Sequence, residues 1–295
     1  MKAKFQDKIA TVILYIISSF VVILLIVLLG YILYNGRTCL NPKFLFGEPK
    51  IGEAGGGIGP QLFNSFYMLI ISLVITVPIG IGAGIYLAEY AKKGILLNIT
   101  RLCIETMASL PSIVVGLFGL LLFVNKMHSK FTLLAGALSI AILNLPSLTR
   151  VSENAIRAAS EGVKEASLGL GASRWQTIQK VVLPSAIPQI LTGIILAAGK
   201  IFGESAALLY TSGMSAPTLH FNNVSLINKT SAFSVMRPAE TLSVYIWKLN
   251  SEGMVPDASK IASGAAAVLV IMVLIFNLSA RILGKKIYES YTGKK

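Results

Sequence analysis

The sequence predicts an all-α integral membrane protein with six transmembrane helices. Of its 295 residues, 54% are hydrophobic and only 13% are charged, whereas soluble domains carry about 25% charged residues. A soluble core of this size does not need so many apolar residues, so the composition favours the membrane class. The apolar residues form six runs near the length of about 20 residues that a helical span requires: residues 9–34, 65–90, 102–124, 131–148, 187–210 and 261–283.

Local signals refine these runs in order. The first run lacks a small-residue cleavage site and is too long for a signal-peptide core, so it is interpreted as a span. In the second run, Gly80, Gly82 and Gly84 favour close helix packing over nucleotide binding. Pro111 and Pro146 interrupt the third and fourth runs. The fifth run carries charges, considered below, and the sixth precedes a short basic tail.

The distribution of Lys and Arg predicts the orientation. Most of the 26 basic residues fall on one side of the membrane, and an excess of Lys and Arg marks the cytoplasmic side. We therefore expect both termini to be cytoplasmic, in a bacterial-type plasma (inner) membrane. Scattered loop charges also account for the net charge of +13, and no nucleic-acid module signature is present.

The predicted organisation has three parts. Residues 1–64 hold the first transmembrane helix and a glycine-rich outer loop. Residues 65–283 form a core of five transmembrane helices, with a long cytoplasmic loop at 150–186 and the longest outer connection at 211–260. Residues 284–295 form a cytoplasmic tail. In the outer connection, residues 241–250 are apolar enough either to lie at the membrane interface, where Tyr245 and Trp247 fit, or to form a loop helix packed on the bundle.

Cysteine and histidine give no site. Cys39 and Cys103 are too few for a disulfide framework, and no Cys/His cluster suggests a metal. We therefore expect no metal and no cofactor bound by this chain.

The cytoplasmic loop predicts short helical segments. Ser152 is in an N-cap position for a helix over 152–159, and a second helix begins at 163–168. Gly169 and Gly171 break that helix, and a third segment over 172–182 is expected to stop at Pro184 and Pro188.

A small, smooth elbow follows from the residues in this loop. Glu165, Ala166 and Gly171 let another protein approach the backbone closely, and Trp175 lies beside them. A plain inner loop would not need two glycines, a tryptophan and a closing Leu-Pro in this order. The stretch therefore predicts a knob that docks into a groove of a partner.

The same stretch resembles the EAA signature of ABC-importer permeases. That signature is E-A-A, three residues, G, nine residues, I, one residue, L-P, and every spacing fits. Its positions are occupied here by Glu165-Ala166-Ser167, Gly171, Val181 and Leu183-Pro184. The resemblance implies a cytoplasmic coupling helix, docked on an ATP-binding subunit. Gly193–Lys200 imitates a phosphate-binding loop, but its spacing is wrong and it lies within a span, so ATP hydrolysis is expected in a separate chain.

Charges within spans are candidates for a substrate path, because burying them is costly. Lys200 and Glu204 are four residues apart, which predicts one helix face. Arg150 and Glu153 are three apart at the inner end of the fourth run. We interpret these residues as a cationic lining for an anion, in which each acid holds its base and limits affinity. The alternative is two structural ion pairs.

Three segments resemble phosphate-specific ABC-importer permeases, the PstA type in particular: ETMASLPSIVVGLFGL, GKIFGESAALLYTSG and RPAETLSVYIWKLNSEG. The resemblance extends from about residue 64 to the last run. It implies a type I ABC-importer permease fold with a cytoplasmic coupling helix. It also implies transport roles for the bases at Arg150 and Lys200 and acidic positions at Glu153 and Glu204. Lys200 replaces the usual Arg, and a lysine binds phosphate without the bidentate fork.

The predicted function is therefore a non-catalytic permease subunit of an ATP-driven phosphate importer. The implied partners are a second similar permease, two ATP-binding subunits, an extracellular or periplasmic phosphate-binding protein and membrane lipid, with no nucleic acid. The nearest alternative is import of sulfate, molybdate or tungstate, since charge alone does not separate these oxyanions. A secondary transporter or channel would predict internal repeats or broken helices around a midplane site. A membrane enzyme is the weakest alternative, because no recognisable acid–base pair accompanies a nucleophile.

Overall fold

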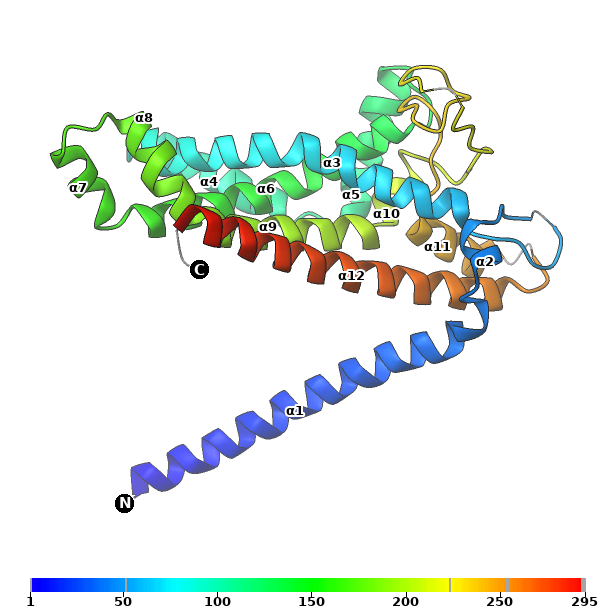
Figure 1. Ribbon diagram of the computed structural model, residues 1–295, viewed down its shortest axis with the longest axis horizontal. Coiled ribbons are helices and arrows are strands. Elements are labelled where there is room, and N and C mark those ends of the chain that lie inside the picture. The colour runs from blue at the N-terminus through cyan, green and yellow to red at the C-terminus, as the bar shows by residue number, and fades with distance from the viewer. Residues whose placement is uncertain (1, 51, 223, 253–254, 293–295) are drawn as a thin grey trace.

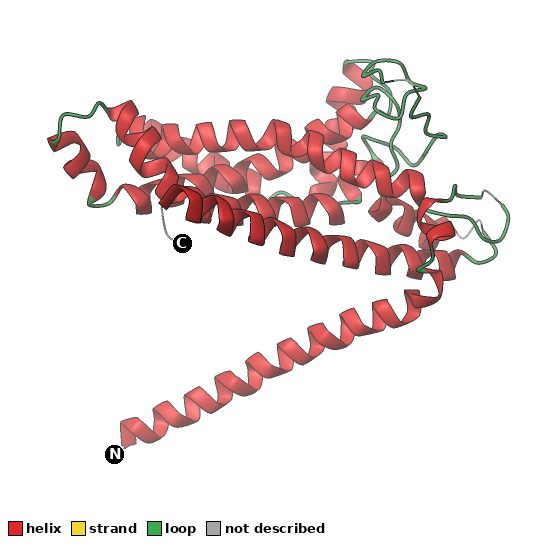
Figure 2. Ribbon diagram, viewed as in Figure 1, coloured by secondary structure: helices red, strands yellow, loops and turns green. Residues whose placement is uncertain are grey.

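The computed structural model describes residues 2–50, 52–222, 224–252 and 255–292, and within them all regular secondary structure is helical (Figure 2). Five helices there are long and apolar enough to cross a membrane. They contain α1 (Lys2–Gly36), α3 (Gly59–Ile85), α6 (Leu133–Ser160), α9 (Leu183–Gly203) and α12 (Ala258–Thr292). The shorter helices are α2 (Pro42–Phe46), α4 (Ile95–Ala108), α5 (Ser112–Gly119), α7 (Val163–Gly169), α8 (Arg174–Thr177), α10 (Ala206–Leu209) and α11 (Leu242–Glu252).

The third predicted span is a bent pair of helices. α4 and the segment that starts with α5 qualify as one span only when taken together, and they meet at an angle of 97°. Pro111 lies at this break, and proline disfavours helical backbone in the residue before it. The predicted set of spans is thus confirmed in the described residues as five unbroken helices and one broken pair.

The other prolines do not end helices. Pro78 and Pro146 lie inside α3 and α6. The prediction that Pro184 and Pro188 stop the third segment of the loop is wrong, because the helical run from Arg174 to Gly203 is continuous. A π turn precedes Pro184 and contains Lys180. Since a proline ring crowds the carbonyl four residues earlier, this wider turn accommodates Pro184.

The expected N-cap at Ser152 is also wrong. α6 continues past the membrane-spanning run to Ser160, so Ser152 is buried in the middle of a helix. No proline or glycine interrupts this stretch until Gly162, where the backbone turns with a φ of +78°. The helix ends where a left-handed conformation, readily adopted by glycine, becomes available.

Helices α3, α6 and α9 pack at the centre of the bundle (Figure 1). Their shared core includes Met68, Ile140 and Phe202, all buried. Glycines in α3 allow a close approach: a Cβ at Gly80 would meet Leu148, and one at Gly84 would meet the α6 backbone at Ser152. The predicted packing role is confirmed at these two positions. A Cβ at Gly82 would have no neighbouring atom within 4 Å, so this glycine faces away from the contact.

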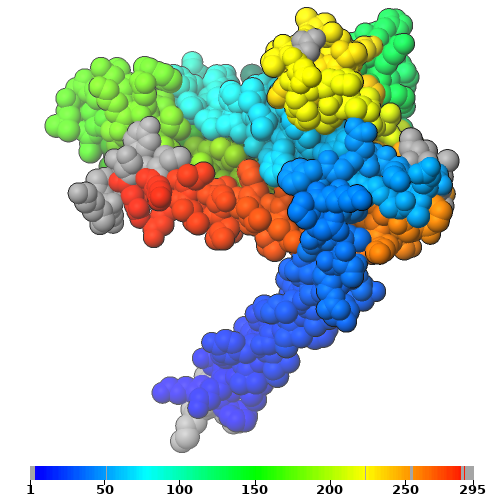
Figure 3. Space-filling model, turned by 45° about the vertical axis from the view of Figure 1, so that its right-hand side comes forward, coloured from blue at the N-terminus to red at the C-terminus, as the bar shows by residue number. Residues whose placement is uncertain are grey.

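Helix α1 stands apart from this bundle. It leaves the remaining helices at an angle, and its C-terminal end meets α12 (Figures 1 and 3). The most apolar stretch of this helix has no buried residue within the chain. Its apolar surface is therefore presented to the surroundings of the bundle along most of its length.

Helix α11 packs on the bundle. Leu242 and Tyr245 are buried in a cluster that also contains Phe44, Ile58 and Ile261. Of the two interpretations of residues 241–250, the packed loop helix agrees with this arrangement. Tyr245 is enclosed by protein, and burial raises the pKa of its hydroxyl to about 12.

Candidate functional site

A cluster of charged side chains lies between α4 and α6. It surrounds a cavity of about 190 Å³. The lining residues are Arg101, Ile104 and Glu105 from α4, and Arg150, Glu153, Asn154 and Arg157 from α6. The three arginines outnumber the two carboxylates, so the cavity carries a formal excess of one positive charge.

Glu153 is the buried centre of this cluster. Both Nε and a terminal nitrogen of Arg101 donate to its Oε1, at 3.0 and 2.6 Å, and Arg157 contacts the same oxygen at 2.9 Å. Its side chain is only 6% exposed. Two arginines therefore satisfy one carboxylate, and each guanidinium keeps donors that are not committed to it.

Arg150 forms a different pair from the one expected. The sequence suggested Glu153 as its partner, but Arg150 pairs with Glu105 of α4. Glu153 points to Arg101 and to Arg157, one turn further along α6. The i, i+3 pairing is wrong because α4 packs against α6 and brings two additional charges within reach. The structure nevertheless places Arg150 and Glu153 on the same cavity.

Lys200 and Glu204 are not paired. α9 ends at Gly203, and Glu204 adopts an extended backbone conformation, so the expected common helix face is wrong. The Glu204 carboxylate instead accepts from the backbone N–H of Ala207, at the start of α10. Lys200 is exposed in the last turn of α9, a position where the helix dipole favours a cation. Neither residue lines the cavity between α4 and α6.

The predicted coupling elbow is an exposed helical projection. α7 contains Glu165 and Ala166, both exposed, and lies at one end of the bundle (Figure 1). Gly171 turns the chain with a φ of +86°, a conformation that costs a residue with a Cβ about 1–2 kcal/mol. Leu183 and Pro184, which close the signature, begin α9.

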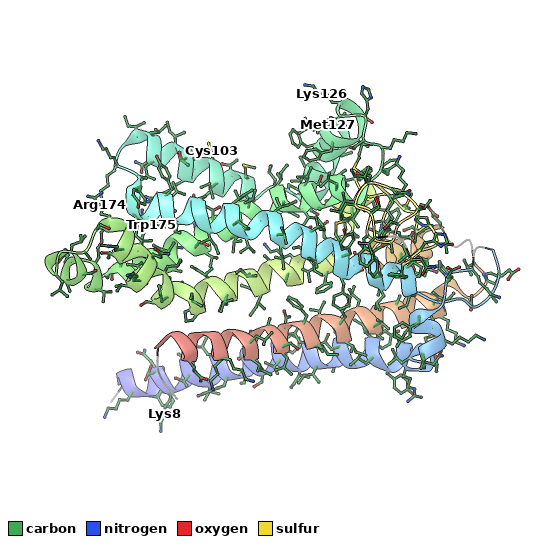
Figure 4. All side chains as sticks on the ribbon, turned by 45° about the horizontal axis from the view of Figure 1, so that its top comes forward. Lys8, Cys103, Lys126, Met127, Arg174 and Trp175 are labelled. Carbon is green, nitrogen blue, oxygen red and sulfur yellow. The ribbon has the colours of Figure 1, made fainter. Side chains whose placement is uncertain are left out.

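A capping box starts the helix after this turn. The Ser173 side chain accepts from the backbone of Gln176, whose side chain in turn accepts from the backbone of Ser173. This arrangement fixes the start of α8 and leaves Trp175 exposed beside α7 (Figure 4). Leu170 is 90% exposed in the turn. The elbow thus combines a capped helix start with apolar side chains that are exposed within the described part of the chain.

A second charged network lies at the opposite end of the molecule. Arg237 is 1% exposed, and it donates to the carbonyl of Ala232 and to the side chain of Asn64 on α3. Burial lowers the pKa of Arg237 to about 10, which leaves it charged at neutral pH. Glu240 accepts from Gln61 and from Lys248. This network fixes the long connection after α10 to the start of α3.

Sequence reasoning missed three members of the α4–α6 cluster: Arg101, Glu105 and Arg157. A signal was present, because Arg101 and Glu105 are four residues apart and Arg157 is four residues after Glu153, spacings that share a helix face. The distance along the chain between the two helices concealed their contact. Sequence reasoning also missed Arg237, a buried cation that holds the connection after α10 to α3.

The molecule combines apolar spans, a partly exposed charged cluster between α4 and α6, and a projecting helical elbow. This combination is typical of a transport permease. This class is supported by comparison with known proteins. The family described as "Binding-protein-dependent transport system inner membrane component" matches residues 80–289. The chain belongs to this family, and it is an integral membrane permease of an ABC importer.

Individual relatives agree with this assignment. A Bacillus subtilis protein named "Probable ABC transporter permease protein YqgI" is 49% identical over 99% of both chains. "Phosphate transport system permease protein PstA" of Yersinia pestis is 35% identical over 81% of this chain and 76% of that protein. The structure of a bacterial ABC transporter for alginate import contains a chain with a TM-score of 0.57 and 18% identity, covering 96% of this chain and 98% of that one. This likeness concerns the fold, which is the type I importer permease fold.

Proposed function

We propose that this chain is the permease subunit of an ATP-driven importer of inorganic phosphate. The observation that carries the proposal is the exposure of Arg150 and Lys200 on membrane helices. A cation within a span is not stable against hydrocarbon, so each of these side chains meets water or protein. The similarity to phosphate-transport permeases over most of the chain supports phosphate as the anion.

The exposed charges on the spanning helices need a second protein to cover them. Arg150 and Glu105 are each about half exposed, and Lys200 is exposed, although all three lie on segments of the spanning bundle. A second, similar permease subunit facing them would enclose a water-filled path lined with positive charge. The elbow of Glu165, Ala166 and Gly171 would dock on one of two separate ATP-binding subunits, which hydrolyse the ATP; this chain is not itself an enzyme.

The orientation follows from the position of the elbow. Because ATP is cytoplasmic, α7 and both termini lie on that side, and the connection between α10 and α11 faces outward. An extracellular or periplasmic phosphate-binding protein would deliver the anion there. Phosphate would then pass Lys200 of α9 and the cavity containing Arg150 and Glu153, while Glu204 shapes the end of α9.

The balance of charges in this path favours release. Each of Arg150 and Arg101 already contacts a carboxylate, so an arriving anion competes with an internal acid. A site without these acids would hold phosphate too tightly for transport. At Lys200, which has no carboxylate partner among the described residues, a single ammonium provides a point charge rather than a bidentate contact.

The test is uptake of labelled phosphate in cells that produce the chain with its binding protein, second permease and ATP-binding subunits. Lys200→Gln and Arg150→Gln are expected to lower uptake at least about tenfold, a loss corresponding to about 1.4 kcal/mol. Lys200→Arg should retain uptake. Lys229→Gln, which removes an exposed cation from the connection after α10, is the matched control and should have no effect.

Competition identifies the anion. Excess unlabelled phosphate should suppress uptake, and equal concentrations of sulfate, molybdate or tungstate should not. Suppression by one of these oxyanions instead of phosphate would replace the proposed substrate and leave the importer class intact. Normal uptake in both Lys200→Gln and Arg150→Gln, at equal membrane abundance, would show that these charges are structural.

A further inference from the structure

Helix α7 is held to the bundle by few contacts. None of its residues is buried. Two side-chain hydrogen bonds to other elements are present in the described residues: Ser167 with Thr177 of α8, and Lys164 with Glu89. The first joins α7 to the helix that follows it directly. The second joins α7 to a segment 75 residues earlier in the chain.

The contact between Lys164 and Glu89 is unusual in its burial. The Glu89 side chain is 4% exposed, whereas that of Lys164 is 32% exposed. A buried carboxylate is unfavourable unless it is paired, so Glu89 strongly favours positions of α7 that keep the ammonium of Lys164 in place. Any movement of α7 must therefore carry Glu89 with it or leave a buried charge unpaired.

Glu89 belongs to a π turn that ends the α3 span. This turn covers Tyr86–Tyr90 and continues α3 directly. Such turns insert one extra residue into a helix and occur frequently at functional sites. Because the turn and α3 form one continuous helical rod, a pull on Glu89 is transmitted to the span.

The same turn also contacts the charged cavity. A terminal nitrogen of Arg157 donates to the backbone carbonyl of Leu87, at 3.4 Å. It also pairs with Glu153, the buried carboxylate at the centre of the cavity. A sequence of polar contacts therefore connects α7 to the cavity, through Lys164, Glu89, the π turn, Arg157 and Glu153.

We propose that Lys164 and Glu89 are positioning residues that transmit the movement of the coupling helix to α3 and, through Arg157, to the charged cavity. When the ATP-binding subunits close, α7 moves, and the buried ion pair makes the π turn follow. Displacement of the Leu87 carbonyl shifts Arg157 relative to Glu153 and changes the number of guanidinium donors available to an anion. This inference rests on the proposed function, because it requires α7 to dock on an ATP-binding subunit.

A purely structural role makes a different prediction. If the pair only stabilises the fold, its loss lowers the amount of assembled complex, and ATP hydrolysis and transport fall together. If the pair transmits movement, its loss leaves docking and hydrolysis in place and lowers the phosphate imported for each ATP hydrolysed. The ratio of transport to hydrolysis therefore separates the two roles.

The experiment uses the complete transporter in lipid vesicles with its binding protein, and measures phosphate import and ATP hydrolysis in the same preparation. Glu89→Gln and Lys164→Met are expected to lower the transport-to-hydrolysis ratio at least about fivefold, the lower end of typical coupling between sites. Lys164→Arg should keep the ratio near that of the unmodified protein. The exchanged pair, Glu89→Lys with Lys164→Glu, should recover most of the loss.

A matched control breaks an exposed ion pair. Lys285 contacts Glu289 on α12, and Lys285→Gln should leave the ratio unchanged. An unchanged ratio in Glu89→Gln and Lys164→Met would overturn the inference, as would a parallel loss of import and hydrolysis or a failure of the variants to retain the ATP-binding subunits. Import by the unmodified complex tests the proposed function separately: without phosphate import there, that function fails before any variant is compared.

Discussion

The contact between α3 and α6 predicts a specific cost for a single methyl group. A Cβ added at Gly84 would lie 2.5 Å from the Cβ of Ser152, 2.9 Å from the backbone nitrogen of Glu153 and 3.0 Å from the carbonyl carbon of Ser152. Two of these atoms are backbone of α6, which packs along α3, so the helices must separate locally. Gly84→Ala is therefore an overpacking substitution.

The magnitude follows from two opposing terms. Overpacking costs about 1–3 kcal/mol, and alanine is better than glycine inside a helix by about 0.5–1 kcal/mol. Gly82→Ala isolates the second term, because the same helix has no atom within 4 Å of the added Cβ there. The difference between the two variants is the overpacking term itself. At about 2–4 °C for each kcal/mol in a chain of this size, Gly84→Ala should melt at least about 2 °C below Gly82→Ala.

The thiol of Cys39 provides a probe for measuring the melting temperature. It is buried, whereas Cys103 is exposed. In a Cys103→Ser background, a dye that becomes fluorescent on reaction with thiols should report unfolding of the detergent-solubilised protein as Cys39 becomes accessible. Equal melting temperatures for Gly82→Ala and Gly84→Ala, or a higher value for Gly84→Ala, would refute the close α3–α6 contact.

Three further predictions address the elbow, the outer network and the orientation. Gly171→Ala should lower phosphate uptake at unchanged membrane abundance, whereas Gly162→Ala, which has a similarly positive φ and lies outside the signature, should not; equal losses would indicate backbone strain alone. Burial raises the pKa of Glu240 above its ordinary value of 4.5, so the folded state binds the proton more tightly and stability should fall as pH rises through the raised pKa. Glu240→Gln should remove that decline in melting temperature, and a persistent decline would assign it to another group. Ile227 and Leu170 are both well exposed, so labelling of a cysteine at either position depends on its side of the membrane. In the Cys103→Ser background, an impermeant thiol reagent applied to spheroplasts should label Ile227→Cys but not Leu170→Cys; the opposite result would invert the orientation.

The sequence was sufficient for the spans and the elbow because their signals are local. Apolar runs identify membrane helices whatever their neighbours, and the turn at Gly171 depends on one backbone conformation. Even the break in the third span has a local cause in Pro111. Broken helices were expected for a secondary transporter, but the break here occurs in an ABC permease and does not separate the two classes.

Two of the three ion pairs at the cavity, Arg101 with Glu153 and Arg150 with Glu105, were not predictable from spacing, because they depend on packing between distant segments. Arg150 selects Glu105 over Glu153 since α4 folds back against α6. Lys200 and Glu204 separate because α9 ends between them, at Gly203. Ser152 resembles a cap only when the membrane run is assumed to end the helix. In each case the prediction used neighbours in sequence, whereas the fold decides where a helix ends and which segment packs against it.

The break between α4 and α5 has a consequence for the stability of unassembled copies of the protein in the cell. Residues 109–111 are exposed at that break. The N–H groups of Ser109 and Leu110 donate to carbonyls in the last turn of α4, and the Pro111 carbonyl accepts from Val114, so the carbonyls of Ser109 and Leu110 are the backbone groups without a hydrogen bond in this described segment. Lipid offers no hydrogen-bond partners, so irregular backbone at membrane depth needs protein or water around it. If the second permease proposed above covers this segment, a copy inserted without that partner would present the unpaired carbonyls to lipid and be less stable. We therefore expect the cellular amount of this chain to follow the synthesis of its partner permease, with unassembled copies removed by degradation.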